Sequence, residues 1–124
     1  MAEENNRINL NRQFAGVLRE LAASPENNPF AVVEQKEAEI CSWQEIEPLL
    51  RGMGLSLVRQ NQCRWFLREV IRLLCSQSPY VAQHIKFCIG KWQVFGLNRE
   101  LLQLLVCEVY EWAKRQKRDD ARAA

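Results

Sequence analysis

The stretch Gln62–Leu74, with the sequence QCRWFLREVIRLL, decides the fold class because its apolar residues recur at the spacing of one helical face. Arg64, Arg68 and Arg72 recur every four residues on the other side of such a helix, and Trp65 falls among them. We therefore expect an amphipathic helix with an indole framed by guanidinium groups on its outer side. The inner side would consist of Cys63, Phe66, Leu67, Val70, Ile71 and Leu74.

Similar helical signals follow one another along the chain. Asn28 before Pro29 is typical of an N-cap followed by proline at the first helical position. Ser42 and Glu45 have the spacing of a capping box, which predicts that a helix begins at Trp43. Segment 30–41 could be helical or could start as a short strand over residues 30–33, and we favour a helix. The remaining predicted helices cover residues 9–23, 57–75, about 80–94 and 99–117, with Asn98 as the N-cap of the last.

These signals predict an all-α protein without a substantial sheet. With 124 residues, the chain fits a single compact domain of five or six helices, arranged orthogonally or as a bundle. We expect residues 1–8 to be a flexible N-terminus, residues 9–117 to form the helical domain, and residues 118–124 to be a charged, frayed tail.

The chain carries its charge unevenly. The net charge is −5 over residues 1–47 and +7 over residues 48–124. No apolar run approaches the roughly 20 residues of a membrane span, so we expect no membrane partner. The N-terminal residues MAEENN are acidic and polar, unlike a leader peptide, which makes an intracellular, cytoplasmic location the default expectation.

The chain lacks the residue patterns of common catalytic and metal sites. It has one histidine, His84, and the cysteine four residues later, Cys88, lies on the same helical face, but no aspartate precedes the C-terminal tail to orient such a pair. The five cysteines include no CxxC pair, so we expect neither a zinc site nor a redox pair. We predict that the protein is not an enzyme and uses no metal, cofactor or small-molecule substrate.

Two surfaces remain as candidates for binding. The first combines Trp65 with the arginines of its helix and with Arg59, because guanidinium groups and an indole can recognise a protein or a nucleic acid. A rival interpretation is that the acidic segment Glu34–Glu47 pairs with these arginines inside the domain. In that case the arginines would stabilise the fold rather than bind a partner.

The second candidate surface is apolar. Tyr80, Phe87 and Val94 recur every seven residues, off the main apolar face of their helix. One interpretation makes this helix the buried centre of the domain, and the other gives the stripe to a partner or a twofold mate. Leu104 and Cys107 similarly fall off the predicted core face of the last helix.

The leading functional hypothesis is a non-enzymatic helical module for protein–protein interaction. It would be a small subunit or adaptor of a larger assembly, or a homodimer. The alternative is an RNA- or DNA-binding subunit that uses the arginine and tryptophan face.

Overall fold

The computed structural model describes residues 2–23 and 28–123, and within them every regular element is a helix. The elements are α1 (Ala2–Ala23), a short 3-10 helix η2 (Pro29–Val32), α2 (Gln35–Gly52), α3 (Leu57–Cys75), α4 (Val81–Val94) and α5 (Arg99–Ala123). The predicted all-α class and single domain are confirmed.

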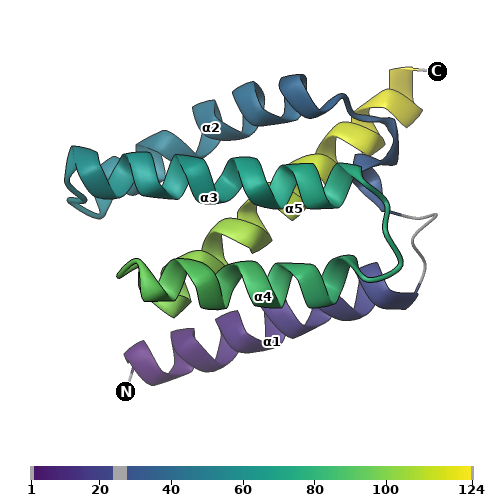
Figure 1. Cartoon of the computed structure of the whole chain (residues 1–124). Coiled ribbons are helices and arrows are strands. Elements are labelled where there is room, and N and C mark those ends of the chain that lie inside the picture. The colour runs from purple at the N-terminus through teal and green to yellow at the C-terminus, as the bar shows by residue number, and fades with distance from the viewer. Residues whose placement is uncertain (1, 24–27, 124) are drawn as a thin grey trace.

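Four of the helices form a layer, and the fifth crosses it. In Figure 1, α2, α3, α4 and α1 lie side by side in that order, and α5 runs diagonally across them. Each neighbouring pair in the layer is in contact, and α5 contacts all four helices as well as η2. The last helix is therefore the central one, and the interpretation that makes the helix at about residues 80–94 the buried centre is wrong.

Local signals set several of the helix ends as predicted. The side-chain oxygen of Asn28 accepts a hydrogen bond from Phe30 N, and that of Asn98 accepts from Glu100 N. Both are N-cap interactions that satisfy amides left free at a helix start. Gly54 and Gly96 adopt positive φ values of 70° and 97°, as glycine does after a helix.

Several helix boundaries differ from the predictions. Ser42 does not start a helix: it lies inside α2, fully buried, because residues 38, 42, 46 and 50 form one inward stripe that a continuous helix buries. Segment 30–41 contains no strand, and it divides into η2 and the first turns of α2 rather than forming one helix. The first and last helices of the chain extend beyond their predicted limits, since α1 begins at Ala2 and α5 continues to Ala123. Met1 and Ala124 lie outside the described residues.

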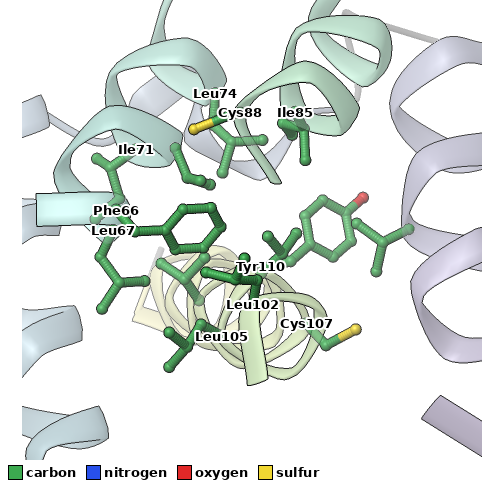
Figure 2. Close-up of a cluster of buried hydrophobic side chains, with 14 of the residues drawn as sticks. Phe66, Leu67, Ile71, Leu74, Ile85, Cys88, Leu102, Leu105, Cys107 and Tyr110 are labelled. Carbon is green, nitrogen blue, oxygen red and sulfur yellow. The ribbon is translucent and has the colours of Figure 1, made fainter. Parts of the chain in front are cut away.

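The core lies where α3 and α4 meet α5. Figure 2 shows side chains from these three helices converging, with Phe66 of α3 and Leu102 of α5 among them. All six residues predicted for the inner side of α3 are buried. The prediction for α5 is wrong at Cys107, which is fully buried because α5 is surrounded by its neighbours.

Candidate functional site

The predicted arginine and tryptophan face lies on the outer side of α3. Trp65 is 57% exposed, and Arg64, Arg68 and Arg72 are exposed around it. The guanidinium of Arg68 lies 5.1 Å from the centre of the Trp65 ring, a cation–π contact. The helical register therefore places these four residues together as the sequence predicted. We call them the α3 face.

Helix α2 extends the α3 face with residues that the sequence analysis did not select. The guanidinium of Arg64 lies 5.5 Å from the ring centre of Trp43, which is half-buried. Ile40, 51% exposed, helps line a cavity of about 350 Å³ between the two helices, along with Trp43 and Arg64. The capping-box interpretation of Ser42 placed Trp43 at a helix start. It therefore did not predict that Ile40 and Trp43 lie on one continuous face of α2.

The acidic segment pairs with the α3 face at one position. Glu39 Oε2 lies 3.7 Å from Arg68 Nε, a loose ion pair in which Arg68 is exposed and Glu39 is half-buried. Glu45 instead accepts two hydrogen bonds of 2.9 Å from Arg115 on α5, and Glu47 pairs with Arg51 within α2. The acidic residues point in several directions around α2, so internal pairing accounts for only part of the arginine stripe.

Arg59 does not belong to the α3 face. It is half-buried on another side of α3, where its Nη1 donates hydrogen bonds to Gln62 Oε1 and, at 3.5 Å, to the carbonyl oxygen of Phe95. Its guanidinium also lies beside Gly96. Arg59 therefore links the start of α3 to the end of α4.

The second candidate surface is exposed on α4. Tyr80, which precedes the helix, is 62% exposed, Phe87 is 78% exposed and Val94 is 86% exposed. The opposite face of α4, formed by Val81, Ile85, Cys88 and Ile89, is buried. We call Tyr80, Phe87 and Val94 the α4 stripe. Leu104 is half-buried on α5 and is not part of this stripe.

Cys88 and His84 do not form a nucleophilic pair. His84 is exposed, whereas Cys88 is buried and its thiol donates a hydrogen bond of 3.2 Å to Glu69 Oε2. The pKa of the Cys88 thiol is raised to about 12. Burial is the largest cause of this shift, and the hydrogen bond to Glu69 is the next. The thiol is thus held in its protonated form, which is a poor nucleophile.

Glu69 connects α3 with α4. Its Oε1 accepts a hydrogen bond of 2.9 Å from Lys91 Nζ. Partial burial raises the pKa of Glu69, but the hydrogen bonds from Lys91 and Cys88 outweigh this effect and lower it. The charged carboxylate of Glu69 is therefore held by contacts with α4 and joins the two helices.

No family model, no curated protein and no solved structure matches this chain. Among the described residues, His, Cys, Asp and Glu form no group of three or more that could hold a metal ion. None of the helices described is both long enough and apolar enough to cross a membrane.

Proposed function

We propose that the protein is a non-enzymatic protein-interaction module and that the α4 stripe is its interface with a second copy of the chain. The exposure of Phe87 and Val94, at 78% and 86%, carries the proposal. Large apolar side chains exposed in a row mark contact surfaces more often than isolated ones do. From Tyr80 to Val94 the stripe extends for about 21 Å along the helix axis.

The spacing along α4 supports a helix as the partner. A seven-residue recurrence of apolar residues is the pattern of a helix that packs lengthwise against another helix. Gly90 lies between Phe87 and Val94, and a Cβ atom added there would meet nothing within 4 Å. This position is open at the surface, and its missing side chain lets another helix approach closely. In an antiparallel twofold pair, Phe87 of each copy would pack over Gly90 of the other.

The charges around the stripe are compatible with self-association. Helix α4 contains Lys86, His84 and Lys91 but no acidic residue. Lys91 is already paired with Glu69, which reduces the repulsion between two copies of the helix. A different partner, as expected for an adaptor or a small subunit, would instead need acidic residues beside its own apolar stripe.

The oligomeric state tests this proposal directly. We expect light scattering after size-exclusion chromatography to show dimers at high micromolar concentration. Phe87→Glu and Val94→Glu should give monomers, because each would place a charge inside the interface. Ile40→Glu is the matched control: it changes an exposed apolar residue of α2 to the same charge and should leave the dimer intact.

A second variant separates association from folding. Gly90→Ala should stabilise the helix by about 0.5–1 kcal/mol, because alanine is the better helix former. It should nevertheless weaken the dimer, because the added methyl group would hold the two helices farther apart. A wild-type protein that stays strictly monomeric at high micromolar concentration would refute the homodimer. A Gly90→Ala protein that associates as tightly as the wild type would refute the packing of Phe87 over Gly90.

The α3 face supports a second candidate function, binding of single-stranded nucleic acid. An exposed indole beside three arginines can stack on a base while the arginines contact phosphates. With three phosphate contacts, the affinity should fall with salt at a logarithmic slope of about −2. A triple Arg64→Glu, Arg68→Glu, Arg72→Glu variant should lose oligonucleotide binding, whereas Arg12→Glu on α1 should keep it. A folded triple variant that binds as well as the wild type would refute this function.

A further inference from the structure

A groove lies between α1, α4 and α5, on the part of the fold away from α2. Its volume is about 630 Å³, within the range of about 300–1,000 Å³ of small-molecule sites. Phe14, Leu18 and the small side chain of Ala15 form its apolar wall on α1, and Ala82 adds to it from α4. The groove therefore has room for an apolar body several atoms wide.

Gln103 of α5 lines the groove and is only 3% exposed. Its Oε1 atom is buried and has no hydrogen-bond partner among the described residues. A buried polar atom without a partner destabilises a fold, whereas an apolar side chain of similar shape would not. The amide oxygen is thus unfavourable for the fold of this chain alone, and a rotation of the Gln103 side chain toward the groove would let a donor there satisfy it.

The rim of the groove is positively charged. Three exposed cations line the groove, Arg19 of α1, Lys86 of α4 and Arg99 of α5. The acidic residue among the described lining residues is Glu100. Cations from three helices therefore surround an apolar wall and a buried acceptor. From this combination we propose that the groove binds a small organic acid with an apolar body and one N–H or O–H donor.

The parts of such a ligand correspond to the parts of the groove. The ionised acid group would lie among the three cations, and the apolar body would pack against Phe14, Leu18 and the alanines. The donor would give its hydrogen bond to Gln103 Oε1. The groove requires neither the α4 stripe nor a dimer.

Two closely similar acids test the proposal. Indole-3-acetate has an aromatic body, a carboxylate and an N–H donor, whereas 1-naphthylacetate has no such donor. In a ¹⁵N NMR titration of the full chain, both should shift the amides of Arg19, Gln83 and Gln103. We expect indole-3-acetate to bind at least several-fold more tightly, because only it can satisfy Gln103.

Three variants complete the test. Gln103→Leu should remove the preference for indole-3-acetate while keeping or raising the urea midpoint of unfolding. Lys86→Gln, a surface change that leaves the core intact, should weaken both acids several-fold. Lys36→Gln on α2 is the control and should change neither affinity.

Three results would overturn the proposal. The first is the absence of any saturable shift in the wild type up to millimolar acid. The second is an unchanged affinity of Lys86→Gln for both acids. The third is a Gln103→Leu protein that keeps the preference or unfolds at clearly lower urea, since the glutamine would then serve the fold.

Discussion

Asn28 should contribute more to stability than its position in a loop indicates. The side chain is 3% exposed and makes two hydrogen bonds. Its oxygen accepts from Phe30 N at 3.0 Å, and its Nδ2 donates to the carbonyl oxygen of Leu74 at 2.8 Å. Leu74 lies in the last turn of α3, where carbonyl groups lack partners within the helix. Asn28 therefore caps the start of η2 and the end of α3 at once.

The expected cost of Asn28→Ala follows from these two contacts. Loss of the N-cap costs about 1 kcal/mol. The carbonyl oxygen of Leu74 would remain buried without a donor, which costs about 1–3 kcal/mol more. We therefore expect the free energy of unfolding to fall by about 3 kcal/mol. With a urea dependence of about 2 kcal/mol/M, the midpoint of unfolding should move down by about 1.5 M.

Urea unfolding, followed by far-ultraviolet circular dichroism, measures this change against two controls. Asn98→Ala removes an exposed N-cap without a link across the fold, and it should cost only about 1 kcal/mol. Asn28→Asp keeps the cap but turns a second acceptor toward Leu74, so it should destabilise the protein at neutral pH as strongly as Asn28→Ala. Equal costs for Asn28→Ala and Asn98→Ala would refute the reasoning, because the buried link to α3 would then contribute nothing.

Further predictions concern the contacts between helices. Tyr110→Phe removes a 2.8 Å hydrogen bond to Glu20, an exposed residue that water can solvate, so thermal unfolding should show a loss of about 1 kcal/mol. Gly96→Ala should cost about 1–2 kcal/mol in chemical denaturation, because φ is 97° and the new Cβ would lie 3.0 Å from Arg59 Nη1. The lowered pKa of Glu69 contributes stability that is complete above the ordinary glutamate value of about 4.3 and is lost as the pH falls below it. The difference in stability between wild type and Glu69→Gln should therefore shrink in acid, and a difference that stays constant down to pH 3 would contradict this assignment.

The sequence was most informative where a structural signal is local. The inner and outer sides of α3 follow from helical periodicity alone, which correctly placed Trp65 on the solvent side. The N-caps at Asn28 and Asn98 depend on residues within three positions of each other, so they were predictable as well. The seven-residue recurrence also identified Tyr80, Phe87 and Val94 as a second apolar stripe, but it did not determine whether that stripe is buried or exposed.

The capping-box prediction at Ser42 shows where local signals fail. Ser42 and Glu45 have the correct spacing, but Ser42 is fully buried inside a continuous helix. Packing the long inward stripe of α2 against the rest of the core stabilises the chain more than a single cap interaction would. Because the residues that cover this stripe are distant in sequence, the short pattern could not reveal them.

The sequence by itself determined that the chain is helical, where α3 and α4 begin and end, and which side of α3 faces solvent. Only the tertiary structure decided that α5 is the central helix, that α4 leaves its second stripe exposed, and that Gln103 lies buried beside a cationic groove. The physical reason is that periodicity reports how apolar a helical face is but not how many neighbouring helices cover it. That coverage depends on packing between segments far apart in the chain.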